Sequence, residues 1–292
     1  MLVLNYPKRQ SVDFSNTLLK LYELAKNTPE AKIHFDLSKS ELLTPLGIIM
    51  LTATIYECHQ SGKACSYSGP QDPELNRFLT DAGFHEHFGL DDLSKERIDA
   101  ITTGTVRLKK TRGLDPMLIE TLTEILDFHL HISPGVKGFL QMSLLETMTN
   151  VVDHSGVKDY FVCCWNYPEK NQIRLCIADL GMGIRASLRK SSEYSSLTGD
   201  RKAIILSTKE GVSSRSGRAG MGLSQIMKFL KVNKGQMCII SGKGKVFWKF
   251  DRGKTLQPAM SKIFNGTIVK LVINTKKEWR YFLSDETQYL FK

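Results

Sequence analysis

Hydrophobic and polar positions follow different patterns in the two halves of the chain. Up to about residue 90, segments with helical spacing at 12–26, 48–60 and 73–82 alternate with short strand-like segments at 31–37 and 64–69. Helices that alternate with short strands are typical of an α/β unit whose strands are covered by helices. The first half is therefore predicted to be a small α/β module.

The second half begins with helices and continues mainly as strands. After a polar connecting segment at 90–100 and a strand at 103–110, two helices are predicted over 116–131 and 134–154. Further strands are predicted at 160–167, 172–179, 237–241, 245–250 and 266–274, with a helix at 222–231. The segment 185–219 is polar, and only 202–207 within it has a helical pattern. Helices followed mainly by strands are typical of an α+β domain.

Charge is distributed as unevenly as the hydrophobic pattern. The 292 residues carry a net charge of +10, with 41% hydrophobic and 24% charged residues, which excludes a disordered chain. Residues 1–95 hold nine Lys and Arg against twelve Asp and Glu, whereas residues 185–254 hold sixteen against four. The length and this contrast predict two domains, 1–95 and 96–292. The basic stretch favours an anionic partner.

Cysteine spacing and the length of the apolar segments indicate whether the protein binds zinc, is secreted or enters a membrane. The six cysteines have no spacing typical of a zinc site, and Cys163 and Cys164 lie in an apolar strand where core packing explains them. The first residues do not have the pattern of a signal peptide. The longest apolar stretch, 42–55, is too short to cross a bilayer. We expect a cytoplasmic protein that does not enter the membrane.

The helix predicted at 134–154 carries the first candidate site. Glu146, Asn150 and His154 are four residues apart, so they project from one face at successive turns. The opposite face is apolar. A carboxylate and a carboxamide one turn apart suit a general base and a Mg²⁺ ligand, although a solvated polar face would have the same pattern.

Glycine-rich segments supply the other candidates. Asp179 ends a predicted strand and is followed by Gly181 and Gly183, which allow the backbone to approach a ligand closely. Residues 217–223, Gly-Arg-Ala-Gly-Met-Gly-Leu, open a helix, and free N–H groups at a helix start bind anions. A plain turn and a flexible linker would explain the two segments equally well. The pair Gly266-Thr267 begins the last predicted strand.

The order of these motifs resembles that of the GHKL ATPases, which have the Bergerat fold. The resemblance covers about residues 100–275, and the segments ETMTNVVDHSG (146–156) and RAGMGLSQI (218–226) are most similar to the anti-sigma-factor serine kinases. It implies an α/β sandwich, which is a mixed sheet with helices on one face, in a cytoplasmic signalling protein that uses ATP and Mg²⁺. Many members of the family act as dimers, and no dimer surface is evident from this sequence.

The resemblance also implies a role for each matching residue. Glu146 would be the general base, Asn150 would bind Mg²⁺, and Asp179 would contact the adenine amino group. Gly181 and Gly183 would let the adenine pocket close. The remaining matches are Gly220, Met221, Gly222 and Leu223 for the phosphates and Thr267 for the adenine side. His154 matches a position often occupied by histidine in the serine kinases, without a defined role.

The basic stretch would then form a lid over the phosphates. Its cations are Arg185, Arg189, Lys190, Arg201, Lys202, Arg215 and Arg218. We expect one or two of them to contact a γ-phosphate, with Arg185, Arg215 and Arg218 as the candidates, and the others to be solvated.

The first half has a second resemblance, to the STAS domains of anti-sigma-factor antagonists. It rests on a strand that leads into Asp36-Leu37-Ser38, on Gly47 opening a long helix, and on Ala82-Gly83-Phe84 ending a later helix. The phosphorylated serine of that family precedes the glycine, but here Pro45 and Leu46 stand before Gly47. Thr44, the nearest hydroxyl, fits a helix cap. The module is therefore expected to dock or regulate rather than accept phosphate.

Three functions remain as expectations. The resemblance to the GHKL ATPases implies that the chain would bind Mg·ATP and phosphorylate a Ser or Thr of a partner, or hydrolyse ATP to switch partner binding. Alternatively, it is a nucleotide-gated, anti-sigma-like interaction module without relevant turnover. A third alternative is a nucleic-acid binder that uses residues 185–254, which is disfavoured because Tyr194 and Phe229 are the only aromatic residues of 185–246. The implied protein partner is a STAS-like or sigma-like regulator.

Overall fold

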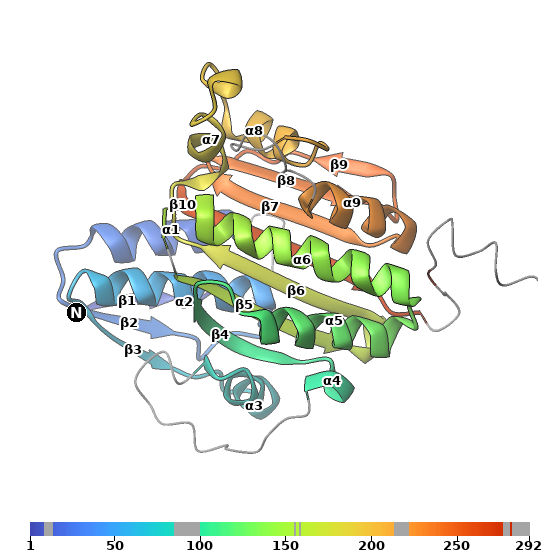
Figure 1. Ribbon diagram of the computed structural model, residues 1–292. Helices are drawn as coiled ribbons and strands as arrows, with labels where there is room; N and C mark the ends of the chain where they lie inside the picture. Colours follow the sequence, from blue (N-terminus) through green and yellow to red (C-terminus); the bar gives the residue numbers. More distant parts are fainter. Residues whose placement is uncertain are drawn as a thin grey trace, which may run out of the picture.

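The computed structural model describes residues 1–8, 14–84, 100–154, 156–157, 159–212, 222–276 and 281, without the side chains of residues 153 and 154. It is an α/β structure with two separate sheets (Figure 1). The predicted boundary at residues 95 and 96 lies outside the described residues.

The first sheet belongs to the N-terminal half. Its three strands are parallel in the order β1-β2-β3, with β2 in the middle. The elements of this half are β1 (Leu2–Asn5), α1 (Phe14–Asn27), β2 (Lys32–Asp36), α2 (Pro45–Gln60), β3 (Ala64–Ser68) and α3 (Pro73–Asp81). The strand β1 was not expected from the sequence pattern.

The N-terminus of α2 explains the Pro and Gly that precede its apolar run. The Thr44 hydroxyl accepts a hydrogen bond from the Gly47 N–H at 3.3 Å, and Pro45 occupies the first turn, where a missing N–H is tolerated. The expected role of Thr44 as a cap is therefore confirmed. The helix begins three residues before the predicted Ile48, because the cap and the proline fix its start.

The second sheet has seven strands in the order β4-β5-β6-β10-β7-β8-β9. Its strands are β4 (Val106–Arg112), β5 (Asp159–Tyr167), β6 (Gln172–Asp179), β7 (Gln236–Gly242), β8 (Gly244–Lys249), β9 (Lys254–Leu256) and β10 (Phe264–Asn274). Every neighbouring pair is antiparallel, so the predicted mixed sheet is wrong. Hairpins connect β5 with β6, β7 with β8 and β8 with β9, helices lie between β4 and β5 and between β6 and β7, and β10 returns to lie between β6 and β7.

Helices of the second half cover one face of this sheet. They are α4 (Ala100–Thr103), α5 (Pro116–Leu130), α6 (Pro134–His154), α7 (Gly183–Leu188), α8 (Asp200–Ser207) and α9 (Gly222–Asn233). Figure 1 shows α5, α6 and α9 lying across the sheet. Their apolar sides share a core with alternate residues of the strands, such as Val162, Ile177 and Leu271.

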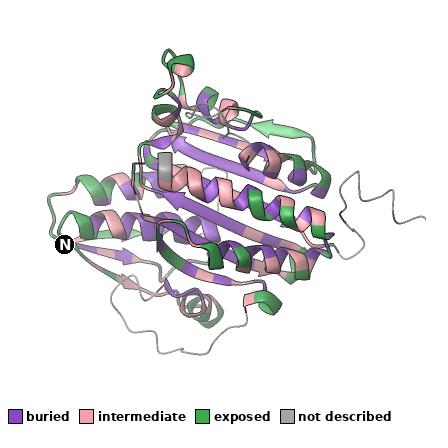
Figure 2. Cartoon of the chain, viewed as in Figure 1, coloured by how far each residue is buried: buried purple, intermediate pink, exposed green. Residues whose placement is uncertain are grey.

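The opposite face of the sheet packs against the N-terminal half. One continuous core joins apolar side chains of α1, α2 and β2 to Phe161, Cys176 and Ile268, which alternate with the residues of the other face. The sheet is consequently buried on both sides where the two halves meet (Figure 2). Among the described residues, no helix has the length and apolar character needed to cross a bilayer.

Candidate functional site

The polar face of α6 carries Glu146 and Asn150 as the spacing predicts. Both are half-buried, whereas Leu144 and Met148 on the other side of the helix are in the core. The two polar side chains thus lie one turn apart on a face that is neither fully solvated nor closed. The side chain of His154 lies outside the described residues.

The first turn of α9 packs closely against this part of α6. A Cβ at Gly222 would lie 3.0 Å from Glu146 Cβ and 3.1 Å from the Ser143 carbonyl oxygen. The Ser143 hydroxyl donates a hydrogen bond to Gln225 Oε1 at 3.0 Å. Gly222 therefore allows the start of α9 to approach the backbone of α6 beside Glu146. Leu223, the next residue, is half-buried against the helical core.

The other residues expected around the phosphates are not described. Gly220 and Met221 precede α9, and Arg215 and Arg218 lie in the same segment, outside the described residues.

Asp179 is the buried acidic residue of the site. It ends β6, is 3% exposed, and its carboxylate accepts a hydrogen bond from the Gly181 N–H at 2.8 Å. Thr267 lies directly opposite on β10, and its backbone N–H and hydroxyl also donate to the carboxylate. The predicted partners Asp179, Gly181 and Thr267 are therefore brought together.

Burial dominates the electrostatics of this carboxylate. Desolvation raises the pKa of Asp179 to about 7, and the hydrogen bonds from Gly181 and Thr267 only partly oppose it. A carboxylate in this setting gains from any further hydrogen-bond donor that reaches it. A neutral amino group could supply that donor without adding a buried charge.

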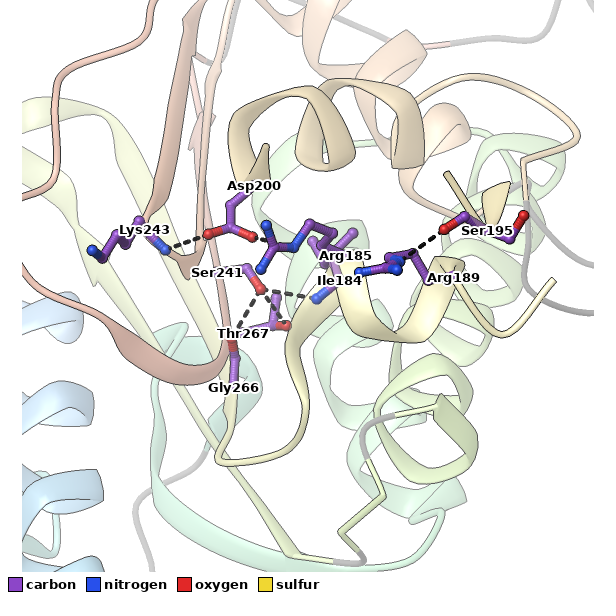
Figure 3. Close-up of polar contacts among 9 residues, drawn as sticks. All are labelled: Ile184, Arg185, Arg189, Ser195, Asp200, Ser241, Lys243, Gly266 and Thr267. Carbon is purple, nitrogen blue, oxygen red and sulfur yellow. Dashed lines mark hydrogen bonds and ion pairs between the residues drawn. The ribbon is translucent and has the colours of Figure 1, made fainter. Parts of the chain in front are cut away.

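A serine that the motifs did not indicate holds the glycine loop in place. The Ser241 hydroxyl, at the end of β7, accepts a hydrogen bond from the Ile184 N–H and donates one to the Gly266 carbonyl oxygen, both at 2.9 Å (Figure 3). It also lies 3.4 Å from the Thr267 hydroxyl. Ser241 is buried, so these contacts tie the start of α7 to the start of β10.

Two glycines make this arrangement possible. Gly183 has φ of +78°, and a Cβ there would be 2.8 Å from Ser241 Oγ. Gly266 has φ of +118°, and its Cβ would overlap the carbonyl oxygen of Asp179. Both positions combine a left-handed backbone with a close approach, which only glycine tolerates. The glycine pattern therefore has a steric cause at this site.

The described lid cations mostly contact the protein itself. Arg185 forms an ion pair with Asp200 at 3.0 Å, and the same carboxylate accepts the Lys243 N–H at 2.8 Å (Figure 3). Arg189 donates to the Ser195 carbonyl oxygen at 2.9 Å, and Arg201 to that of Gln257 at 3.0 Å. Lys190 and Lys202 are exposed.

This segment is also more ordered than its polar sequence suggested. The helix expected at 202–207 is confirmed as α8, which begins at residue 200, whereas α7 over 183–188 was not expected from the sequence pattern. Contacts with Ser241 and Asp200, rather than local hydrophobic periodicity, hold these short helices.

The loop after Asp179 links the two parts of the site. A Cβ at Gly156, just beyond α6, would lie 3.0 Å from Met182 Cε. The segment that follows α6 and the loop 180–182 are therefore in contact. The chain that leaves the helix of Glu146 and Asn150 thus passes beside the loop that follows Asp179.

The described side chains do not include a group of three or more His, Cys, Asp or Glu residues that could hold a metal ion. A Mg²⁺ ion that is bound largely by phosphate oxygens and water needs only one or two protein ligands. Asn150 has the amide oxygen for such a role.

Comparison with models of known protein families found no match to this chain. Comparison with curated protein sequences found no significant match either.

Proposed function

We propose that residues 96–292 form a Bergerat-fold ATPase domain of the GHKL type, which binds Mg·ATP, and that residues 1–95 form a STAS-like docking module. The ATPase domain would transfer the γ-phosphoryl group to a Ser or Thr of a protein partner, or to water. The observation that carries the proposal is the Asp179 carboxylate, which is buried at a strand end and accepts hydrogen bonds from Gly181 and Thr267. The helix of Glu146 and Asn150 leads into the segment that contacts the loop after Asp179.

The chemistry of Asp179 suits recognition of adenine. The exocyclic amino group of adenine is a neutral donor, and its hydrogen bond would stabilise the ionised form of a carboxylate whose pKa burial has raised to about 7. Gly181, which donates to Asp179, carries no side chain that would obstruct a flat base.

The neighbouring helices α6 and α9 are suited to bind the phosphates of the proposed ATP. Asn150 offers one oxygen to Mg²⁺, which keeps the rest of its octahedral shell for phosphates and water. The start of α9, brought against α6 at Gly222, directs a helix N-terminus to the same region, where N–H groups and the helix dipole favour anions. Bound Mg²⁺ would neutralise phosphate charge during transfer.

Glu146 would accept the proton of the attacking hydroxyl or water. It lies one turn before Asn150 on the same half-buried face, so a nucleophile between them would meet both the base and the metal-bound phosphate. The same geometry serves kinase and hydrolase chemistry, and the partner decides between them.

The test combines nucleotide binding with turnover. Titration calorimetry with Mg·ATP should detect binding by the wild type and by Glu146→Ala, and weaker binding by Asp179→Asn. Incubation with γ-labelled ATP and candidate partner protein should label the partner or release phosphate with the wild type, and neither with Glu146→Ala. The matched control is Glu120→Ala, at an exposed position of α5.

The outcomes separate the alternatives. Failure of the wild type to bind Mg·ATP would refute the proposal. Unchanged turnover in Glu146→Ala would remove that residue from the reaction. ATP-dependent capture of a partner that survives Glu146→Ala would replace catalysis by nucleotide-gated binding.

A further inference from the structure

A second feature lies on the face of the seven-stranded sheet opposite α5, α6 and α9. Side chains on this face belong to alternate residues of each strand and form rows across the sheet. One row runs from Arg174 through Val272 and Gln236 to Lys249 and Lys254. The next contains Cys176, Lys270, Cys238, Phe247 and Leu256.

The charges on this part of the face are all positive. Arg174, Lys270, Lys249 and Lys254 lie in the two rows, and Lys245 follows in the next. None of the positions of β6, β10, β7, β8 and β9 that point to this face is Asp or Glu. Among the ion pairs formed by described residues, none involves these five cations.

These cations repel one another across the sheet, although Arg174 also lies over the Tyr167 ring at 4.3 Å and donates a hydrogen bond to Gln172 at 3.1 Å. Lys249 and Lys254 are directly opposite on antiparallel neighbours, where like charges are destabilising. The pKa of Lys270 is lowered, mainly by burial and further by the nearby Arg174 and Lys245. A positive field without local compensation is therefore built into the sheet, which is the condition for binding an anionic partner.

The N-terminal half ends at the border of this region. The Lys245 ammonium donates to the Ser15 hydroxyl at the start of α1, at 2.9 Å, while the core shared with that half includes Cys238 and Ile240. Beyond Lys245, the strand β9 is exposed, and Leu256 is 43% exposed. The surface formed by Arg174, Lys270, Phe247, Lys249 and Lys254 is called the basic sheet face below.

Phe247 indicates which kind of anion suits this face. Its half-buried ring packs against the core shared with the N-terminal half and lies between Lys245 and Lys249 on β8, about 7 Å along the strand from each. Lys249 Nζ lies over the ring, 5.0 Å from its centre. When Lys249 turns to a phosphate, this face of the ring is free for an unpaired base to stack on it. An acidic peptide would use the cations but not the ring.

We propose that the basic sheet face binds single-stranded nucleic acid without strong sequence preference. The phosphates contact Lys249, Lys254, Lys270 and Arg174, and an unpaired base stacks on Phe247. This binding does not rest on the proposed ATP site, which lies at the other end of β6 and β10.

Fluorescence anisotropy with a labelled oligo(U) of about ten nucleotides tests the proposal on the full chain. The wild type should bind, and its affinity should fall steeply between about 50 and 200 mM salt. The double variant Lys249→Glu/Lys254→Glu should bind at least about tenfold more weakly. Its slope of log K against log salt should be smaller by about 1.4, since each phosphate contact on a single strand contributes about 0.7.

Two further variants test whether binding needs the aromatic ring and whether it depends on where the charges lie. Phe247→Leu keeps an apolar side chain but removes the ring, and should weaken binding by roughly fivefold or more. Lys209→Glu/Lys231→Glu makes the same change in net charge at exposed positions of the helical side and should leave affinity nearly unchanged. If Phe247→Leu does not fold, as judged by circular dichroism, the lysine variants and their salt slopes still decide.

Several results would overturn the proposal. One is that the wild type does not bind oligo(U), and another is that the Lys209→Glu/Lys231→Glu control loses as much affinity as the Lys249/Lys254 variant. A third is that Mg·ATP displaces the oligonucleotide, which would locate it in the nucleotide site. Polyglutamate that binds as tightly as oligo(U) and is insensitive to Phe247→Leu would assign the face to an acidic protein segment. Unchanged ATP binding by the lysine variants keeps this test separate from the ATPase proposal.

Discussion

Replacing Asp179 by Asn should change how the stability of the protein depends on pH. The carboxyl group is buried, and its pKa is about 7 in the folded chain against 3.8 for an ordinary Asp. The folded state therefore holds a proton between about pH 4 and 7 that the unfolded chain has lost. The amide that replaces the carboxyl group in Asp179→Asn does not titrate and adds no buried charge.

The sign and size of the effect follow from these values. Because the folded pKa is raised, the stabilisation from protonation is fully present below about pH 4 and is lost as the pH rises through 7. A pKa difference of this size corresponds to about 4 kcal/mol. The amide keeps an acceptor for the Gly181 N–H but loses part of the Thr267 contacts, which costs about 1 kcal/mol at every pH.

Urea unfolding between about pH 5 and 8, followed by the fluorescence of the buried Trp165 and Trp248, measures the difference. The free energy of unfolding of Asp179→Asn minus that of the wild type should rise by about 2–3 kcal/mol from pH 5 to 7 and then level off. Asp115→Asn is the control, because Lys109 and the Leu118 N–H lower the pKa of Asp115 and its difference should be flat over this range. A flat difference for Asp179→Asn would refute the assignment of a buried, proton-holding carboxyl group.

Two further substitutions test the packing of the site. Ser241→Ala leaves the Ile184 N–H and the Gly266 carbonyl oxygen without their partner and should lower the free energy of unfolding by about 1–3 kcal/mol, whereas Ser195→Ala, at an exposed hydroxyl, should have almost no effect. Gly222→Ala places a methyl group 3.0 Å from Glu146 Cβ and should destabilise by about 1–3 kcal/mol. Gly138→Ala in α6, where the added Cβ meets nothing within 4 Å, should instead stabilise by up to about 1 kcal/mol, and equal effects of the two glycine changes in urea unfolding would contradict the close approach of α9 to α6.

The long elements and the main candidate residues could be predicted from the sequence. The helix over 134–154 was predicted with the bounds that α6 has, since Pro134 fixes its start and its apolar positions recur over many turns. The strands over 160–167 and 172–179 and their short connection were also predicted and are confirmed. The approach of Asp179 to Thr267 agrees with the expectation that the two residues act together.

Features that depend on distant contacts were missed. The strand β9 has three exposed residues and gains its structure by pairing with β8, and β1 by pairing with β2. The helix α7 is only six residues long and is held by the Ser241 hydroxyl, 57 residues away in the chain. Ser241 itself has no local signal, because a serine at the end of an apolar strand is ordinary. The direction of strand pairing likewise depends on where β10 inserts.

The position of Leu180 connects the proposed site with the N-terminal half. It follows Asp179 directly, packs against the core shared by both halves, and lines a cavity of about 210 Å³ together with Tyr56 of α2. Tyr56 in turn donates to Asp159 at 2.9 Å, at the start of the strand paired with β6. Because α2 packs on β5 and β6 through this core, a partner that displaces α2 also changes the support of the loop that follows Asp179. The N-terminal half thus supports the loop that follows Asp179. If the proposed nucleotide site is correct, a partner that docks on α2 should change nucleotide affinity through these packed side chains.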